Sequence, residues 1–282
     1  MIRIGNINRL RVLRKVDFGV YLNGEDYDSI LLPKKYVPAD CEVDDLLDVF
    51  IYFDSDDRII ATTEKPFAMV GDIACLKVVA VNSTGAFLDW GLPKDLLVPF
   101  SEQNKKMKEN EFYVVQIYLD ERTNRIVASS RLNKFLSDVF PEEYSSGTQV
   151  DLLIADKTDF GFTTVVDDYY LGVLYDNEVF EELKLGQKIT GYIKKIRSDG
   201  KADITLYKKG YGRITDLSKL ILDKLESNGG FLPVTDKSAP ELISKMFGAS
   251  KKSYKKAIGA LYKKRLITLE NDGIKITRQD KL

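Results

Sequence analysis

Histidine is absent from this 282-residue sequence, and its absence excludes several classes of catalyst. Without an imidazole the chain can form neither a Ser-His-Asp nor a Cys-His arrangement, and zinc sites that use histidine are excluded too. Cysteine is nearly absent as well. We expect Cys41 and Cys75 to be free, half-buried thiols rather than a disulfide.

Long apolar runs are also missing. No stretch approaches the roughly 20 apolar residues that a membrane-spanning helix needs. The opening MIRIGNINRLRVLRK lacks the apolar core of a secretory signal. We therefore expect a soluble cytoplasmic protein without a membrane partner. Its length is as compatible with several small domains as with one large domain.

Acidic residues become scarce near the end of the chain. Residues 1–70, 71–145 and 146–211 are each mildly acidic, whereas residues 212–282 carry 15 basic and 8 acidic residues. No acidic residue occurs from Leu242 to Leu269, a stretch that holds eight Lys or Arg. This asymmetry predicts a polyanionic partner for the basic segment.

A glycine followed by a strand-like run occurs three times, in DFGVYL at 17–22, STGAFL at 83–88 and DFGFTT at 159–164. After each glycine, at an interval of 39 or 40 residues, a basic residue follows a polar turn; these residues are Arg58, Arg125 and Lys201. A fixed interval of this kind indicates a structural repeat.

The second repeat predicts five short strands, at residues 73–81, 86–90, 95–100, 112–119 and 125–130. The span between the third and fourth strands is less regular. Five strands with a break after the third suit the small Greek-key barrel called the OB-fold. We predict a mainly β protein with five-stranded barrels at residues 1–64, 65–144 and 145–210.

Residues 211–282 predict helices and a hairpin instead of a barrel. Helices are expected at about 215–227 and at 238–247, the second with Ser238 as its N-cap. A third helix has an apolar face at helical spacing, opposite its lysines, made of Tyr254, Ile258, Leu261 and Tyr262. Residues 266–276 form a hairpin around Asn-Asp-Gly. This order predicts an α/β tail of the winged-helix type, in which the third helix usually contacts nucleic acid.

These motifs resemble those of a known family. The segments VGDIACLKVVAVNSTGAFLDWGLPKDLLVPFSE and YVVQIYLDERTNRIVASSRL resemble the opening and close of an S1-type RNA-binding domain. The likeness is weaker in the third repeat and weakest in the first. Three such units before a tail containing GFLPVTDKSAPELISKMFGASKKSYKKAIGALYKK are similar to the conserved virulence factor B family. The resemblance implies an RNA-binding regulator of bacterial gene expression with no catalytic centre.

An S1-type surface stacks bases on exposed aromatic rings and contacts phosphates with basic residues. The RNA-binding candidates are Phe18, Tyr21 and Arg58 in the first repeat, Phe87, Asp120 and Arg125 in the second, and Phe160 and Lys201 in the third. In the tail they are Lys251, Lys252, Lys255, Lys256, Lys263 and Lys264.

Each repeat departs from the full S1 set. S1 domains usually carry two aromatic residues flanking the glycine and a histidine on the third strand. Thr84 replaces the first aromatic in the second repeat, and Pro99 stands at the histidine position. We expect Trp90, which lies beyond the usual stacking positions, to pack inside its barrel.

Structural alternatives stay open for these candidates. The aromatic rings could pack within the barrels, and the basic residues, including the tail lysines, could form merely solvated faces. At the level of the whole protein, duplex DNA binding through the winged helix and docking on the ribosome or the transcription machinery are alternatives to single-stranded RNA.

A nuclease is a further alternative, because carboxylates could hold Mg²⁺; the candidates are Asp44, Asp45, Asp54, Asp56 and Asp57. Consecutive acids in a turn usually face water, however. We therefore predict that the protein is not an enzyme and that it uses no cofactor, metal or small-molecule substrate.

Overall fold

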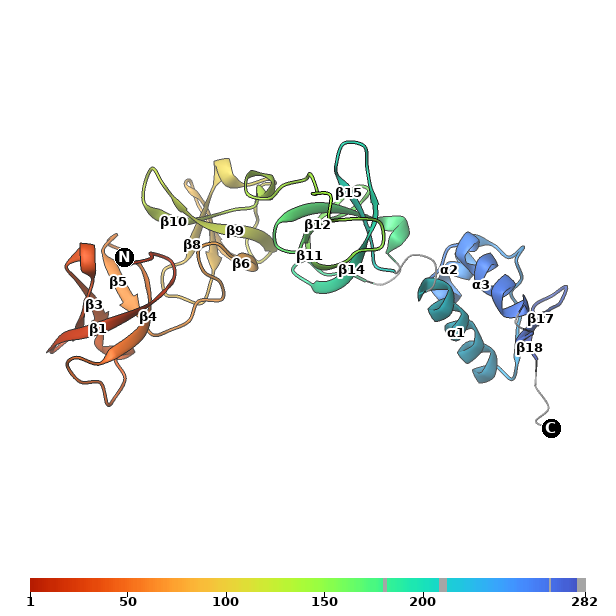
Figure 1. The fold of residues 1–282 in the computed structure, drawn as a ribbon, viewed down its shortest axis with the longest axis horizontal. Coiled ribbons are helices and arrows are strands. Elements are labelled where there is room, and N and C mark those ends of the chain that lie inside the picture. The colour runs from red at the N-terminus through yellow and green to blue at the C-terminus, as the bar shows by residue number, and fades with distance from the viewer. Residues whose placement is uncertain (180–181, 208–211, 264, 278–282) are drawn as a thin grey trace. The chain divides into compact units, whose positions relative to one another are not determined.

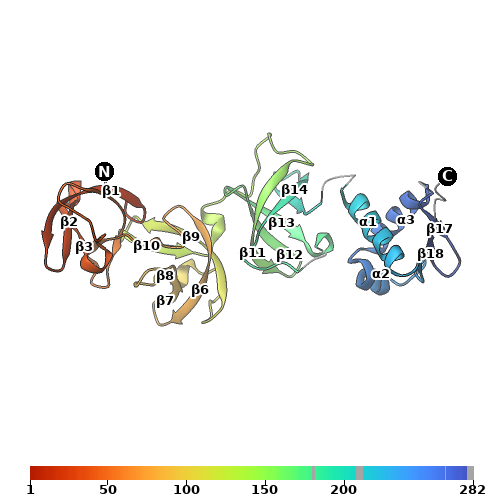
Figure 2. The ribbon, with the colours of Figure 1, turned by 90° about the horizontal axis from the view of Figure 1, so that it is seen from below.

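The computed structural model describes residues 1–179, 182–207, 212–263 and 265–277. The chain divides into two compact units, Met1–Leu136 and Ser137–Leu282. The described residues form three closed five-stranded barrels and a C-terminal domain of helices with a small sheet (Figures 1 and 2). The predicted fold class, tandem OB-type barrels followed by a winged helix, is confirmed.

Barrel 1 consists of β1 (Ile7–Val16), β2 (Gly19–Asn23), β3 (Ser29–Pro33), β4 (Leu46–Phe53) and β5 (Ile59–Thr62). The strands close in the order β1-β2-β3-β5-β4, with β3 and β5 parallel and the other neighbours antiparallel. Side chains alternate along the strands: in β1, Leu10 and Val12 are buried, whereas Arg9 and Arg11 are exposed. The apolar side chains on one face of each strand therefore fill the interior of the barrel.

Barrel 2 repeats this order with β6 (Ile73–Val81), β7 (Gly85–Asp89), β8 (Leu96–Pro99), β9 (Phe112–Asp120) and β10 (Arg125–Ser129). Every predicted strand of this repeat is present, with its ends within one residue of those expected. The less regular span begins with a short 3₁₀ turn, Phe100–Glu102.

Barrel 3 has the same strand order, in β11 (Gln149–Thr158), β12 (Gly161–Val166), β13 (Tyr170–Tyr175), β14 (Lys188–Ile196) and β15 (Ala202–Thr205). Residues before its first strand join its core. Phe140 stacks on Tyr170 with ring centroids 4.8 Å apart, and Tyr144 meets the same ring edge-on at 5.3 Å.

Barrels 1 and 2 share a hydrophobic core, in which Trp90 is 3% exposed. The Trp90 indole N–H donates a hydrogen bond of 2.6 Å to the carbonyl of Lys94, and its ring lies edge-on to Phe50 of barrel 1 at 5.7 Å. The predicted structural role of Trp90 is confirmed, and the side chain also joins two repeats. Both cysteines are free; Cys75 is half-buried as expected, whereas Cys41 is buried.

The repeated glycine sits where two backbones come too close for a side chain. A Cβ added to Gly19, Gly85 or Gly161 would collide with the carbonyl oxygen of a residue on the next strand. For Gly161 this residue is Leu174, and the φ angle of +146° adds backbone strain for any other residue. The glycine thus allows the start of β2, β7 or β12 to approach the backbone of the strand with which it pairs.

Substitution of Gly161 by Ala is expected to destabilise barrel 3 by about 1–3 kcal/mol, because the added methyl overpacks a contact with backbone. Amide hydrogen exchange in barrel 3 would measure the loss. Gly147→Ala is the matched control, since Gly147 has a φ of +102° but nothing within 4 Å of the added carbon. Equal losses in the two variants would contradict the role of the close backbone contact.

The C-terminal domain consists of α1 (Gly212–Ser227), β16 (Phe231–Leu232), α2 (Pro240–Phe247), α3 (Lys251–Lys263), β17 (Ile267–Leu269) and β18 (Ile274–Ile276). The predicted helices and hairpin are confirmed. The prediction missed β16, which pairs with β18 to make a three-stranded sheet. No helix among the described residues is both long and apolar enough to span a membrane.

Two local predictions in this domain were wrong. The residue before α2 is Ala239, not Ser238, because the Ser238 hydroxyl instead accepts a hydrogen bond of 2.9 Å from the Thr235 N–H. Tyr262 is 55% exposed, so it lies at the margin of the apolar face of α3. Tyr254 and Ile258 are buried in that face as expected.

Candidate nucleic-acid interface

Barrel 1 presents two aromatic rings at the turn between β1 and β2. Phe18 precedes the glycine and is 57% exposed, and Tyr21 follows it and is half-buried. Their rings meet edge-on with centroids 6.3 Å apart. The Arg14 guanidinium lies 4.4 Å from the Tyr21 centroid, a cation–π distance. Together the three side chains offer a ring surface with a positive charge beside it.

Arg14 was missed in the sequence. It pairs with Tyr21 across the strands because a β-bulge after Val12 shifts the register of β1 against β2. A bulge leaves no clear mark in the sequence. The remaining signal was the position of Arg14 on the strand that precedes the glycine.

Barrel 3 presents one ring at the equivalent turn. Phe160, directly before Gly161, is 73% exposed, and the second aromatic position holds Thr163. A lone exposed ring offers one stacking surface.

Barrel 2 differs from both. Thr84 precedes its glycine and is exposed, and Phe87 on β7 is half-buried. Phe87 lines a cavity of about 460 Å³ to which residues of barrel 1 also contribute, so its surroundings are not those of barrel 2 alone.

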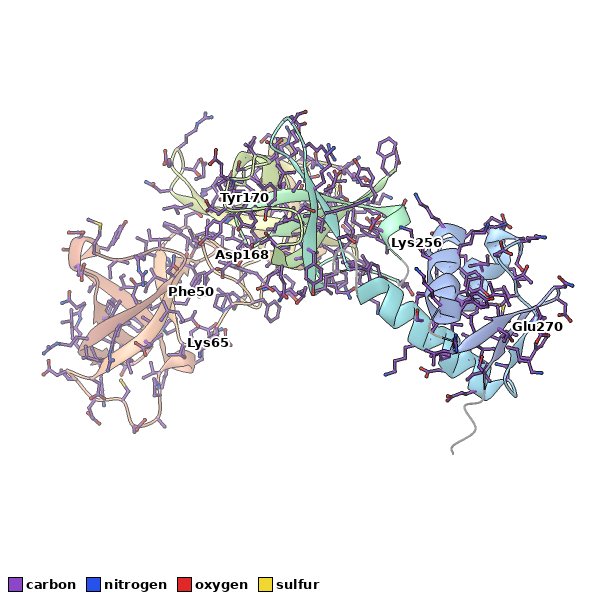
Figure 3. The ribbon with its side chains drawn as sticks, turned by 45° about the vertical axis from the view of Figure 1, so that its right-hand side comes forward. Phe50, Lys65, Asp168, Tyr170, Lys256 and Glu270 are labelled. Carbon is purple, nitrogen blue, oxygen red and sulfur yellow. The ribbon has the colours of Figure 1, made fainter. Side chains whose placement is uncertain are left out.

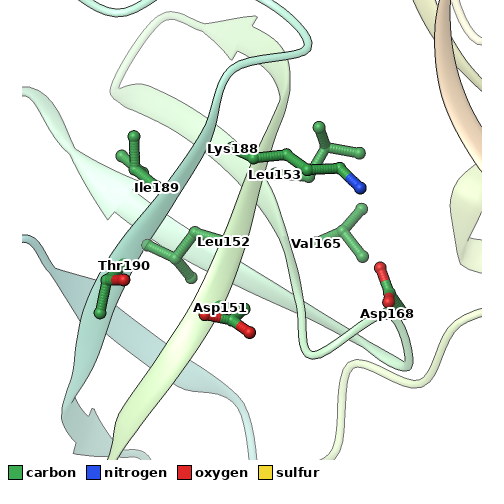
Figure 4. Close-up of a pocket in the computed structure, with 8 residues that line it drawn as sticks. All are labelled: Asp151, Leu152, Leu153, Val165, Asp168, Lys188, Ile189 and Thr190. Carbon is green, nitrogen blue, oxygen red and sulfur yellow. The ribbon is translucent and has the colours of Figure 1, made fainter.

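A second hollow, of about 350 Å³, lies on barrel 3 against β11 and β14 (Figure 4). Aliphatic side chains line it together with Asp151, Asp168, Lys188 and Thr190. Its lining contains no aromatic ring and none of the predicted binding residues. It therefore offers no surface on which a base could stack.

The predicted basic residues of the barrels all have carboxylate partners. The Arg58 guanidinium donates to Asp54 through Nε at 3.0 Å and Nη2 at 2.8 Å. Arg125 forms a close ion pair with Asp57, and Lys201 lies 2.6 Å from Asp138. The positive charge of each of these residues is therefore balanced by at least one carboxylate.

Two carboxylates show the effect of these contacts. A hydrogen bond from the Lys94 ammonium, together with nearby Arg125, holds the pKa of Asp57 below its usual range. Asp120 accepts a hydrogen bond within its own turn. The Thr123 hydroxyl donates to the Asp120 carboxylate at 2.6 Å, and this bond lowers the pKa of Asp120. The predicted site residues Asp120 and Arg58 are thus engaged within their own turns, whereas Lys201 pairs with Asp138, ahead of the first strand of barrel 3, and Arg125 reaches across to barrel 1.

The acidic residues considered for a nuclease do not converge. Asp44 pairs with Arg11 at 3.5 Å, Asp45 accepts the Glu42 N–H at 2.7 Å, and Arg58 engages both Asp54 and Asp56. Within the described part of the chain, no group of three or more Cys, Asp or Glu is placed to hold a metal ion.

The packing of α3 holds its lysines outward. Tyr254 is fully buried, stacks on Phe247 at 5.1 Å and donates a hydrogen bond to the Val234 carbonyl at 3.2 Å. Burial raises the pKa of the Tyr254 hydroxyl. The opposite face of the helix remains exposed, as Figure 3 shows for Lys256.

The predicted lysines of α3 fall into two groups. Lys251 donates to the Lys237 carbonyl at 3.1 Å, and Lys255 pairs with Asp236 at 3.3 Å. The other three, Lys252, Lys256 and Lys263, are exposed and have no carboxylate within ion-pair distance among the described residues. Lys264 lies outside the described residues.

Comparison with known families agrees with this architecture. The S1 domain family matches residues 4–64 and 70–130, and the CvfB-like winged helix domain family matches residues 219–276. The first repeat, in which the likeness was weakest, is thus one of the two matched S1 segments. The fold and these matches define a nucleic-acid-binding protein built from S1 domains and a winged helix.

Relatives match along nearly the whole chain. The conserved virulence factor B of Staphylococcus epidermidis strain ATCC 12228 is 27% identical over 291 residues, covering 98% of this chain and 95% of the relative. The chain is thus similar, over nearly its whole length, to members of the conserved virulence factor B family. The uncharacterized protein YitL of Bacillus subtilis strain 168 is 29% identical over 283 residues, covering 95% and 92%. A crystal structure of a multidomain protein with nucleic acid binding domains from Streptococcus pneumoniae is 22% identical, with a TM-score of 0.43, and covers 97% of this chain and 98% of that chain.

Proposed function

We propose that this protein binds single-stranded RNA through its barrels and its winged helix, and that it regulates the expression of other genes without catalysis. The observation that carries the proposal is the pair of exposed rings, Phe18 and Phe160, at the same turn of two barrels. Exposed aromatic rings on an OB-type surface stack on unpaired bases and tolerate many sequences.

The barrels and the winged helix contribute different interactions to RNA binding. The three predicted basic residues of the barrels, Arg58, Arg125 and Lys201, are paired with carboxylates, so they add little net positive charge to the stacking surfaces. The unpaired lysines of α3 supply the electrostatic attraction to phosphates. We propose that residues 1–64, 65–144, 145–210 and 211–282 are the domains that bind one strand together. The first two share a core and act as one receptor, and the connection of this pair to the other domains raises the effective concentration of each part for that strand.

Replacing Lys252, Lys256 and Lys263 by Gln is expected to weaken RNA binding and to flatten its salt dependence. Each lost phosphate contact reduces the slope of log K against log salt by about 0.7 for a single strand, so the triple variant should lose up to about 2. Fluorescence anisotropy at several salt concentrations would measure the slope. As a control, replacing Lys105, Lys106 and Lys108 of barrel 2 by Gln removes the same amount of charge elsewhere. This control variant should keep the salt dependence of the parent protein. Equal slopes in both variants would leave the α3 lysines with a purely solvated role.

Duplex DNA is a second candidate ligand, because the free lysines lie on the third helix of a winged helix. Anisotropy titrations of the full chain with a single-stranded RNA and a duplex DNA of the same sequence would separate the two. Tighter binding to the duplex would contradict the RNA proposal. Binding to neither would favour a docking role on the ribosome or the transcription machinery.

A further inference from the structure

The cavity between barrels 1 and 2 has a mixed lining suited to a small polar ligand with an aromatic part. Barrel 2 contributes the rings of Phe87 and Trp90, and barrel 1 contributes Tyr52 and Phe53. Polar and charged residues complete the lining, among them Thr84, Lys94, Arg125 and Asp57. Its volume of about 460 Å³ falls in the range of small-molecule sites.

At the edge of this cavity, barrel 2 lacks a ring that the other barrels have. The residue directly before the glycine is Phe18 in barrel 1 and Phe160 in barrel 3, but it is Thr84 in barrel 2. Thr84 lines the cavity. An aromatic side chain at this position would extend into the space beside Phe87, so the small threonine leaves room for a ring supplied by a ligand.

The charged groups of the cavity form a site that a carboxylate now occupies. Asp57 of barrel 1 accepts from Lys94 at 3.1 Å and forms a close ion pair with Arg125. Lys94 also donates to the Asp54 carbonyl at 2.5 Å. A carboxylate between an ammonium and a guanidinium uses the same donors that bind phosphate. Because Asp57, Lys94 and Arg125 are only partly buried, an anion from solution can reach and replace the carboxylate.

We propose that this cavity binds a single nucleotide, with its base beside Phe87 in the space that Thr84 leaves and its phosphate replacing Asp57 on Lys94 and Arg125. The inference rests on the proposed function, since a free nucleotide and one unstacked nucleotide of an RNA chain offer the same base and phosphate. Barrel 1 closes one side of the cavity, so the site accepts one base and excludes a stacked run of bases.

The indole N–H NMR signal of Trp90 is a specific probe, because Trp90 lines the cavity and is the only tryptophan in the sequence. The full chain would be titrated with AMP, GMP, CMP and UMP, each alongside its nucleoside, to millimolar concentration. At least one monophosphate is expected to shift the signal saturably and to bind more tightly than its nucleoside. Absence of a saturable shift with all four would overturn the proposal.

Variants of residues in and beside the cavity test whether the nucleotide binds there and not elsewhere on the protein. Thr84→Phe fills the cavity and is expected to weaken nucleotide binding at least about 10-fold, whereas Ser83→Phe adds the same ring to an exposed neighbour outside the cavity and should not. Asp57→Asn removes the competing carboxylate and is expected to tighten monophosphate binding about 2- to 5-fold, with nucleoside binding unchanged. Undiminished binding to Thr84→Phe would contradict the proposal.

A single-stranded RNA added to the nucleotide complex identifies the source of the ligand. Displacement of the nucleotide means that the cavity takes one nucleotide of an RNA chain, and simultaneous binding means that it takes a free nucleotide. If no nucleotide binds while RNA binding still depends on Phe18 and Phe160, this inference fails and the proposed function stands.

Discussion

Simultaneous replacement of Phe18 and Phe160 by Ala is expected to weaken binding of single-stranded RNA by about 30-fold or more. Each base that stacks on an aromatic side chain contributes about 1–3 kcal/mol by alanine substitution, and a factor of ten corresponds to about 1.4 kcal/mol. The fold should persist, because the two rings are 57% and 73% exposed and contribute little to the cores. Fluorescence anisotropy at constant salt would measure the dissociation constant.

Phe112→Ala is the matched control for this prediction. Phe112 is 53% exposed at the start of β9, away from the glycine turns, so its removal should leave RNA affinity within about twofold. A folded double variant that binds RNA as tightly as the parent protein would contradict stacking at these positions. The single variants would show how the loss divides between barrels 1 and 3.

Trp90→Ala is expected to have the largest effect on stability, about 3–5 kcal/mol. The substitution removes a large buried side chain from the core that barrels 1 and 2 share, together with its contact with Phe50. Both barrels should open more readily, while barrel 3 should be unaffected. Because a chain of several domains does not unfold in one step, amide hydrogen exchange resolved by barrel is the suitable measurement.

Trp90→Phe separates packing from hydrogen bonding in this core. It keeps an aromatic ring beside Phe50 but leaves the Lys94 carbonyl without its indole donor, a loss of about 0.5–1.5 kcal/mol for a typical hydrogen bond. The alanine variant should therefore be distinctly less stable than the phenylalanine variant. Equal stabilities would show that the ring contributes little to holding the two barrels together.

The fold was largely predictable because the strands of barrel 2 carry β-branched and apolar residues in short runs between polar turns. The glycine and the basic residue 39 or 40 positions later then identified the other two barrels. β16 escaped prediction because two residues show no periodicity. Ser238 was misassigned because its hydroxyl could accept a hydrogen bond either from the first turn of the helix or from the preceding turn. In the structure it accepts from the Thr235 N–H of the preceding turn.

The candidate site was only partly predictable, since its charges depend on contacts between distant residues. The sequence placed Phe18 and Phe160 at equivalent turns, and both are exposed. It could not show that Asp57, which we considered as a solvated acid or a metal ligand, pairs with Arg125, 68 residues further along the chain. Local patterns indicate which residues occur at a turn, whereas partners across two barrels follow from the packing of the whole unit.

The shared core of barrels 1 and 2 changes how these two repeats take part in binding. Because Phe50 and Trp90 lie in one hydrophobic cluster, the two barrels are preorganised, and the entropy cost of fixing their mutual orientation is met during folding. A ligand that contacts both barrels therefore encounters a single rigid receptor and not two tethered ones. As its concentration rises, the ligand should occupy barrels 1 and 2 together in one transition. The two barrels should lose no freedom of mutual orientation when it binds.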